Sequence, residues 1–240
     1  MKLTFLGTRG GITARSKLHY RHSSLLIEYY TSRILIDRGT DWLNKPYPID
    51  LDGILITHAH PDHAEGLQKG TPYNVYAPTE PWERHDHTPR KRTHLIKPYK
   101  PFHINKFTCT AFPVRHSLNA PAVGYKVTAG KRSIFYAPDL VSIIRQRDAL
   151  KNVDAYIGDG AIITRIMLIR RKEHTVTGHA PIIHQLEWCQ KENIKHMIVT
   201  HCGTEITTGQ QHLIEKKLRD LANTYNVKVT LAHDGMTLTI

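Results

Sequence analysis

The sequence predicts an α/β fold, more specifically an α+β arrangement, in which two β-sheets are flanked by helices. Strand-like apolar runs dominate both halves of the chain, and helical periodicity comes between and after them instead of alternating regularly with them. The 240 residues are enough to bury a sizeable core. Because no linker interrupts the chain, we expect a single domain spanning residues 1–240.

The first half is expected to be mostly strands. Alternating or continuous apolar residues predict strands at 2–6, 23–30, 33–37, 53–57 and 74–77. The turn at 7–11 contains three glycines, which permit close approach of the backbone to a ligand or a neighbouring loop. Residues 79–106 are basic and aromatic, and we expect them to be irregular.

The second half combines strands with helices. Further strands are predicted at 106–114, 122–128, 132–137, 153–158, 196–200, 227–232 and 236–240. The periodicity becomes helical from Pro181, a residue suited to the first turn of a helix. A second helix is expected to open with a capping box formed by Thr208 and Gln211. Residues 164–177 have no clear pattern and are compatible with a basic or amphipathic lid.

Composition limits the partners. The formal net charge of +12 favours anionic partners such as phosphate esters or nucleic acid. Aliphatic runs are far shorter than the ~20 residues of a membrane-spanning helix, and the first residues lack a signal-peptide layout. We therefore expect no membrane partner and a cytoplasmic location. No two of the cysteines form a CxxC pair, which argues against a disulfide framework or a cysteine zinc knuckle.

A dense group of imidazoles and a carboxylate follows the strand predicted at 53–57. His58 and His60 share one face of an extended backbone, because side chains alternate with period two. Pro61 suits the first turn of a helix, so Asp62 and His63 can point to a neighbouring position. Imidazole nitrogens and carboxylate oxygens are ligands of zinc-like ions. Two pairs of ligands offset by a turn suggest two metals.

Three further polar residues lie just beyond apolar runs. His116, Asp139 and His201 each follow a predicted strand. Ligands at strand ends converge on one sheet edge, whereas isolated surface histidines would scatter. His85 and His87 have no strand to position them and are not expected to be ligands, and Cys202 is interpreted as a packing residue.

The motif His58-x-His60-x-Asp62-His63, followed by His116, Asp139 and His201, resembles the ligand set of the metallo-β-lactamase fold superfamily. The resemblance spans essentially the whole chain, from the glycine turn to His233-Asp-Gly235. Three features resemble its phosphodiesterase branch, which contains ribonuclease Z and the phosphoribosyl cyclic-phosphate phosphodiesterases. They are Leu6-Gly-Thr-Arg-Gly-Gly11, His116 followed by Gly124-Tyr125, and Thr177-Gly-His-Ala180 ahead of a helix.

The resemblance implies an αββα sandwich of two mixed β-sheets with a dinuclear metal site at one sheet edge. One ion would take His58, His60, His116 and Asp139, and the other would take Asp62, His63, His201 and the shared Asp139. The implied reaction is hydrolysis of a small cyclic or linear phosphodiester, or of a nucleic-acid phosphodiester, by a metal-bridging hydroxide. Asp62 would also accept a hydrogen bond from the attacking water. Zn²⁺, Mn²⁺ and Fe²⁺ all accept such mixed ligands.

Two residues outside this ligand set have alternative readings. The resemblance implies that His179 contacts the phosphate or assists the leaving oxygen, while the simpler alternative is a helix-entry histidine with a structural hydrogen bond. Asp37 could be a carboxylate that steadies a ligating imidazole from the side away from the metal, or it could form a turn before Arg38-Gly39.

Several functions share this pattern. Residues 7–20 lack the cysteine cluster common in the cyclic-phosphate enzymes, and no glycine- and proline-rich arm like that of ribonuclease Z is present, although segments 82–99 and 164–174 are basic. A ribonuclease Z-like endoribonuclease acting on RNA 3′ ends is one alternative. A thioesterase or lactonase of the glyoxalase II type is another, but it has no evident need for His179 or the positive charge. A third alternative is a non-catalytic nucleic-acid-binding protein. Such a protein would be free to lose metal ligands, so the complete ligand set argues against it. A homodimer is compatible with the sequence.

Overall fold

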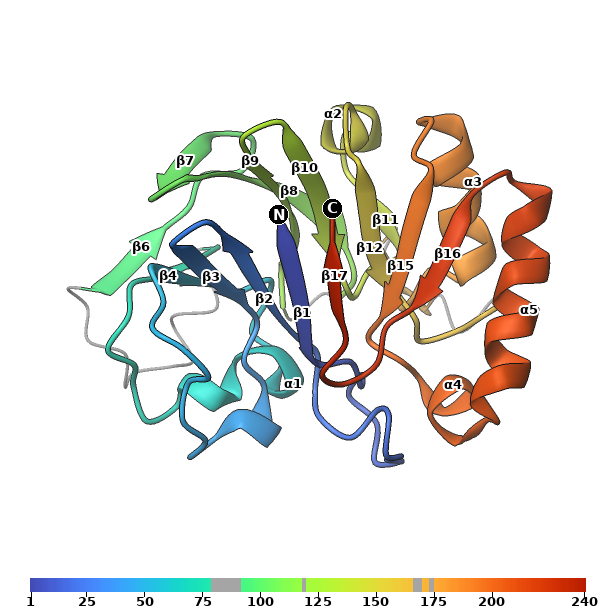
Figure 1. Ribbon diagram of the computed structural model, residues 1–240, viewed down its shortest axis with the longest axis horizontal. Helices are drawn as coiled ribbons and strands as arrows, with labels where there is room; N and C mark the ends of the chain where they lie inside the picture. Colours follow the sequence, from blue (N-terminus) through green and yellow to red (C-terminus); the bar gives the residue numbers. More distant parts are fainter. Residues whose placement is uncertain (79–91, 118–119, 166–169, 173–174) are drawn as a thin grey trace.

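The computed structural model describes residues 1–78, 92–117, 120–165, 170–172 and 175–240, which form two mixed β-sheets with their helices (Figure 1). The first sheet contains β1 (Lys2–Gly7), β2 (Ser24–Tyr29), β3 (Ser32–Ile36), β4 (Gly53–Leu55), β5 (Val75–Ala77), β6 (Thr93–Leu95) and β17 (Thr237–Thr239). The second contains β7 (Pro101–Ile104), β8 (Phe107–Arg115), β9 (Ala122–Ala129), β10 (Arg132–Ala137), β11 (Ser142–Ile143), β12 (Ala155–Asp159), β15 (His196–Thr200) and β16 (Lys228–Leu231).

The two sheets have matching topologies. The first has the order β17-β1-β2-β3-β4-β5-β6, and the second has the order β11-β8-β9-β10-β12-β15-β16 with β7 beside β8. In the first sheet, β1, β2 and β3 pair antiparallel and β3 to β6 pair parallel. In the second, β8, β9 and β10 pair antiparallel, and β10, β12, β15 and β16 pair parallel. Parallel strands gather their carboxyl ends at one edge of a sheet, where ligands usually bind.

Three apolar layers hold these sheets in place. Leu3, Ile34 and Ile157 belong to the core between the sheets. The outer face of the second sheet packs against α2 (Gln146–Leu150), α3 (Ile182–Lys191) and α5 (Gln211–Thr224). The outer face of the first sheet is covered by α1 (Pro61–Ala64) and by irregular chain around Tyr47 and Tyr73. The predicted sandwich is confirmed, with short elements instead of a long helix on the first sheet.

The described structure corrects several local predictions. The segment expected to be irregular contains β6 and β7, and β11 and α2 were not anticipated. Part of 164–177 forms two short strands that pair antiparallel, β13 (Arg170–Lys172) and β14 (Thr175–Thr177). The capping box is wrong, because Thr208 ends α4 (Thr204–Thr208) and its hydroxyl donates to the Thr204 carbonyl at 2.8 Å. α5 begins separately, with Gln210 as a cap that makes no side-chain hydrogen bond.

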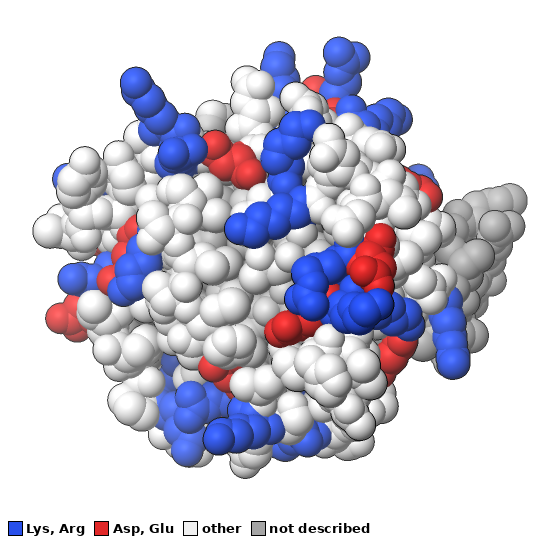
Figure 2. Space-filling model, turned by 45° about the vertical axis from the view of Figure 1, so that its right-hand side comes forward, with Lys and Arg blue, Asp and Glu red and all other residues white. Residues whose placement is uncertain are grey.

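Positive charge is spread over the face shown in Figure 2. Lys and Arg side chains lie there in separate groups, with acidic side chains beside several of them and uncharged surface between. That face therefore presents no continuous basic track among its described residues. In the described part of the chain, every helix is too short or too polar to cross a bilayer.

Two buried tyrosines between the sheets differ in the hydrogen bonding of their hydroxyls, and this difference leads to a prediction about stability. The Tyr125 hydroxyl donates to the Ile56 carbonyl at 2.8 Å, whereas the Tyr136 hydroxyl has no hydrogen-bond partner among the described residues. Losing one hydrogen bond and leaving its acceptor buried costs about 1–3 kcal/mol. We expect Tyr125→Phe to lower the free energy of unfolding by that amount and Tyr136→Phe to leave it unchanged or raise it, as measured by urea denaturation. A larger loss in Tyr136→Phe would contradict the assignment of an unpartnered hydroxyl.

Candidate metal centre

The predicted site residues come together at the carboxyl ends of strands from both sheets. Asp37 follows β3, His116 follows β8 and His201 follows β15. Asp139 lies two residues after β10. The segment after β4 supplies the remaining candidate ligands and ends in α1, where Pro61 occupies the predicted first-turn position. Two of these residues have left-handed backbones, with φ of 63° at Asp37 and 53° at His201. Such strain costs roughly 1–3 kcal/mol and clusters at functional sites.

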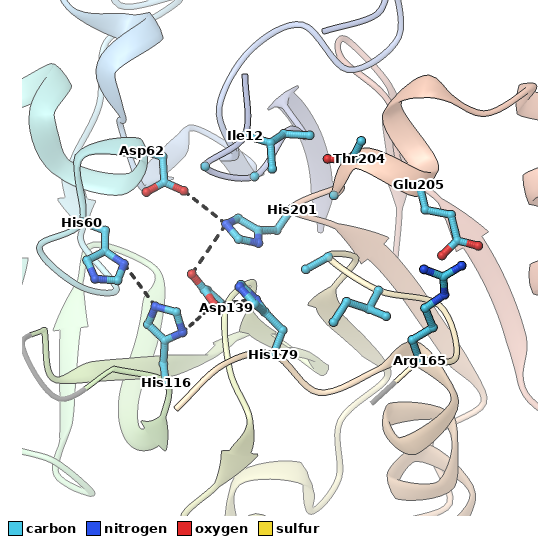
Figure 3. Close-up of a pocket in the computed structure, with 15 residues that line it drawn as sticks. Ile12, His60, Asp62, His116, Asp139, Arg165, His179, His201, Thr204 and Glu205 are labelled. Carbon is cyan, nitrogen blue, oxygen red and sulfur yellow. Dashed lines mark hydrogen bonds and ion pairs between the residues drawn. The ribbon is translucent and has the colours of Figure 1, made fainter. Parts of the chain in front are cut away.

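A cavity of about 620 Å³ opens at this sheet edge (Figure 3). Its inner end is lined by His60, Asp62, His116, Asp139 and His201, together with His179. Two glycines of the turn after β1 form part of its wall. This volume lies within the range of small-molecule sites, about 300–1,000 Å³.

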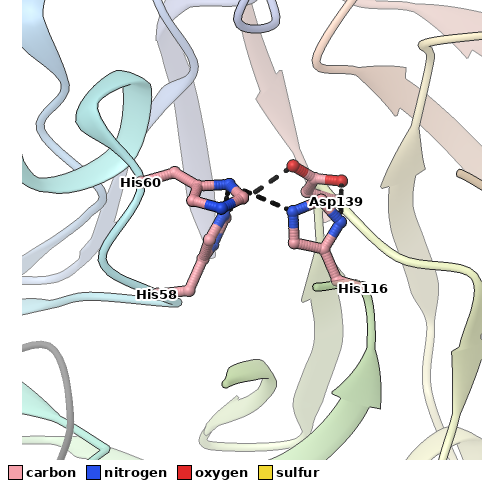
Figure 4. A group of neighbouring side chains, drawn as sticks. All are labelled: His58, His60, His116 and Asp139. Carbon is pink, nitrogen blue, oxygen red and sulfur yellow. Dashed lines mark hydrogen bonds and ion pairs between the residues drawn. The ribbon is translucent and has the colours of Figure 1, made fainter. Parts of the chain in front are cut away.

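One cluster joins three imidazoles and a carboxylate (Figure 4). His60 Nδ1 lies 3.1 Å from both His58 Nε2 and His116 Nε2. Asp139 Oδ2 lies 3.7 Å from His58 Nε2. Ligand atoms at about 2.1 Å from a tetrahedral ion are separated by roughly 3.4 Å. The spacing of these four atoms therefore fits one divalent ion.

A second cluster lies beside the first. His63 Nε2 is 3.2 Å from His201 Nε2, and Asp62 Oδ2 is 3.3 Å from each of these two nitrogens. Asp139 Oδ2 is 3.9 Å from His63 Nε2 and 3.7 Å from His201 Nε2. The same carboxylate oxygen that faces His58 thus also faces this cluster. One carboxylate oxygen of Asp139 thus lies within 4 Å of nitrogens from both clusters.

The pKa shifts of the histidines differ between the two clusters. Burial lowers the pKa of His58 well below its usual value, and burial together with His116 lowers the pKa of His60 to about 4. Neutral imidazoles are the form that binds metal. In the second cluster burial acts to lower the pKa of His63, but Asp62 and Asp37 outweigh it and raise that pKa well above its usual value. These carboxylates attract positive charge, which an ion can supply.

Asp37 and Thr57 support both clusters from behind. Asp37 Oδ2 lies 2.8 Å from His63 Nδ1, and the Thr57 hydroxyl donates to the Asp37 carboxylate at 2.9–3.0 Å. The same hydroxyl lies 3.1 Å from His58 Nδ1. These contacts hold the Nδ1 sides of both rings, so that each Nε2 faces its cluster. Asp37 therefore lies where a supporting carboxylate was predicted, and it also occupies a left-handed backbone position as a turn residue would.

The Thr57 contacts lead to a prediction about metal affinity. Thr57→Val keeps the side-chain shape but removes the hydroxyl, leaving His58 Nδ1 without this acceptor. Loss of such a supporting contact typically costs 10–100-fold in metal affinity. We expect a loss of about that size, measured by competition with a chelating dye, and near-normal affinity in Thr57→Ser. Equal affinity in the valine variant would mean that the hydroxyl does not position the ligands.

His179 contacts a carboxylate that the sequence reasoning missed. His179 Nδ1 lies 2.8 Å from Asp159 Oδ2 and 3.0 Å from Asp139 Oδ1. Burial acts to lower the pKa of His179, but Asp159 and Asp139 raise it to about 11. Since these contacts occupy Nδ1, Nε2 is the nitrogen available to the cavity. Asp159 is the last residue of β12, so the strand-end rule that found Asp139 could have found it.

The glycine turn packs against the second cluster, as its composition predicted. A Cβ added at Gly10 would lie 3.2 Å from the His201 ring, and one at Gly11 would lie 3.0 Å from the Asp62 carboxylate. Asp234 anchors the turn, because its carboxylate accepts hydrogen bonds from the Thr8 and Arg21 amides at 2.9 Å. A larger residue at either glycine would displace a candidate ligand.

Cysteines play no part in this centre. All three cysteines are buried and unpaired. Burial raises the pKa of Cys202 well above its usual value and the pKa of both Cys109 and Cys189 to about 12, so the thiols are poor ligands and poor nucleophiles. The packing interpretation of Cys202 is confirmed. His85 and His87 lie outside the described residues, as do parts of the basic segments 82–99 and 164–174.

Comparisons with known proteins give a consistent result. The model of the family described as beta-lactamase superfamily domain matches residues 32–202. A ribonuclease Z from Picosynechococcus sp. is 29% identical over 156 residues, covering 55% of this chain and 48% of the relative. The metallo-beta-lactamase fold protein YhfI from Bacillus subtilis superposes with a TM-score of 0.75 at 19% identity, covering 99% of this chain and 98% of that one. A diphosphatase of the PhnP family gives 0.73 at 20% identity, covering 100% and 97%.

Proposed function

The chain belongs to the beta-lactamase superfamily domain family, and we propose that it is a dinuclear metal-dependent phosphodiesterase that acts on a small cyclic or linear phosphodiester. The observation that carries the proposal is the position of Asp139 Oδ2 between the His58 and His201 nitrogens, 3.7 Å from each. That position divides the candidate ligands into two sets of four. We propose Zn²⁺ or Mn²⁺ as the ions, with Fe²⁺ also suited to these ligands.

The proposed chemistry divides between the ions and the chain. Two divalent ions would lower the pKa of a water molecule and neutralise charge on the phosphodiester oxygens. Asp62 lines the cavity, and an oxygen of its carboxylate would orient the attacking water by accepting a hydrogen bond. His179 lines the same cavity, and its Nε2 would donate to the phosphate or to the leaving oxygen. Asp159 would hold that ring by its Nδ1 contact.

Similarity to ribonuclease Z supports a second candidate, cleavage near RNA 3′ ends. The chain spans about half of the length of that relative, so an activity of the whole relative is a separate proposal. The cavity of about 620 Å³ favours a small diester as the first choice. We propose that residues 1–240 act as one domain in either reaction.

One assay separates the classes of substrate. We expect hydrolysis of bis-p-nitrophenyl phosphate in the presence of Mn²⁺ or Zn²⁺ and its loss after treatment with a chelator. The same protein is given a thioester, a lactone and a precursor tRNA. Turnover of the thioester or lactone without diester cleavage would overturn the proposal. Cleavage of the precursor tRNA alone would select the ribonuclease candidate.

A further inference from the structure

The cavity has a second end, away from the candidate ligands. Besides the candidate ligands, its lining includes the apolar side chains of Ile12 and Ile162 and the charged side chains of Arg165 and Glu205. Figure 3 places these two charged side chains on the opposite side of the cavity from His60 and His116. A substrate whose phosphodiester lies at the ligands would therefore extend toward this pair.

The charges at this end do not cancel. Glu205 Oε1 lies 2.6 Å from Lys217 Nζ, so its negative charge is compensated from outside the cavity. Arg165 is exposed and forms no ion pair with any carboxylate in the part of the chain that the structure describes. The three charges sum to one positive charge, which is available at the cavity wall.

We propose that this end binds a second anionic group of the substrate, with Arg165 as the residue that contacts it. The inference rests on the proposed phosphodiesterase function and narrows its substrate class to diesters that carry another phosphate or carboxylate. A guanidinium can bind either group through two parallel hydrogen bonds. Ile12 and Ile162 would pack against the apolar part of the substrate between the two anions.

The ion pair between Glu205 and Lys217 decides whether this end of the cavity attracts or repels an anion. An unpaired carboxylate at the wall would repel a second anion, and Lys217 prevents that repulsion. Changes at the three residues should therefore act in different directions. Loss of Arg165 or of Lys217 weakens binding of the second anion, and neutralisation of Glu205 strengthens it.

The test compares substrates that differ in one phosphate. The metal-loaded protein is given the dinucleotide UpU, its terminally phosphorylated form UpUp, and the trinucleotide UpUpU, with bis-p-nitrophenyl phosphate as the reference. We expect kcat/KM for UpUp to exceed kcat/KM for UpU. The substitution Arg165→Ala should lower kcat/KM for UpUp about ten-fold. The same substitution should change kcat/KM for UpU and for bis-p-nitrophenyl phosphate by less than about two-fold. An advantage shared by UpUpU would identify a neighbouring RNA phosphate as the anion, and an advantage limited to UpUp would identify a terminal phosphate.

Control variants separate this effect from general charge. Arg219→Ala removes an exposed arginine on α5 that lies 3.6 Å from Glu215 and does not line the cavity, and it should change no substrate's kinetics. Lys217→Ala should act in the same direction as Arg165→Ala, and Glu205→Gln in the opposite one. Equal kcat/KM for UpU and UpUp in the unmodified protein, or equal losses for all substrates in Arg165→Ala, would overturn the inference.

A failure of the proposed function can be told apart from a failure of this inference. If the metal-loaded chain cleaves no diester, the proposed function is wrong by itself. Binding of uridine 3′,5′-bisphosphate and of uridine 5′-monophosphate is then measured by calorimetry. We expect the bisphosphate to bind more tightly and Arg165→Ala to remove the difference. Equal binding of both nucleotides to the unmodified protein would overturn the inference.

Discussion

Replacing Asp139 by asparagine should lower the metal content from the proposed two ions per chain to one or none and reduce diester hydrolysis by at least about 1,000-fold. Asp139 Oδ2 lies within 4 Å of nitrogens from both clusters. An amide keeps the shape but lacks the negative charge, and only its oxygen can bind a cation. Metal content by plasma mass spectrometry and turnover of bis-p-nitrophenyl phosphate measure the two effects.

A distant carboxylate provides the control for this variant. Asp220 is exposed on α5 and paired with Lys216 at 2.9 Å, so Asp220→Asn should change neither metal content nor turnover. Far-ultraviolet circular dichroism checks that Asp139→Asn remains folded. If a folded Asp139→Asn protein keeps two ions and full turnover, Asp139 is not the shared ligand.

Replacing His179 by alanine should leave the metal content at the level of the unmodified protein and lower kcat for the diester by about 100- to 10,000-fold. The ring lines the cavity, but its Nδ1 is held by Asp159 and Asp139. His179 is therefore placed to contact the substrate through Nε2 instead of completing either ligand set. Loss of a proton donor reduces kcat and leaves the ions in place.

The opposite outcome for His179 has a structural meaning. Asp139, Asp159, His179 and His201 also lie close enough to hold an ion among themselves. If His179→Ala loses metal and its residual turnover follows the metal content, His179 is a ligand or a support for one. His184 is exposed on α3 and outside the cavity, so His184→Ala is the matched control and should keep both metal and turnover.

Residues at strand ends could be found from the sequence. His116, Asp139 and His201 each follow an apolar run, and the structure places all of them beside the segment after β4. Local polarity patterns were enough, because parallel strands bring their carboxyl ends to one edge. Asp159 also comes at the end of an apolar run, but it is the last residue of β12 and does not follow the strand. The predicted strand ended one residue earlier, at Gly158, and Asp159 was therefore not considered.

Long-range contacts could not be found in this way. Asp234 holds the glycine turn through the Thr8 amide, which is 226 positions away in sequence. Arg9 is buried and paired with Asp41, which no local pattern indicates. The sequence identifies Thr57 only as a strand residue. Its contact with Asp37 depends on the parallel pairing of β3 and β4, which a local pattern does not give. Tertiary structure decides these partners.

The capping-box prediction failed at the junction between α4 and α5. Thr208 and Gln211 have the spacing of a capping box, but Gly209 and Gln210 separate two helices there. Ile214 and Leu218 are apolar residues four positions apart, the spacing of one helix face, and both are buried on α5. Hydrophobic periodicity is thus more informative here than a cap signal, because burial of the stripe contributes more free energy than one capping bond.

Titration of the metal-free protein with Mn²⁺ or Zn²⁺, with diester turnover followed at each step, tests the dinuclear phosphodiesterase most directly. The two ligand sets around Asp139 predict that turnover of bis-p-nitrophenyl phosphate rises with added metal and reaches its plateau at two equivalents per chain. A plateau at one equivalent would contradict the dinuclear centre. Absence of diester turnover at every ratio would contradict the phosphodiesterase itself.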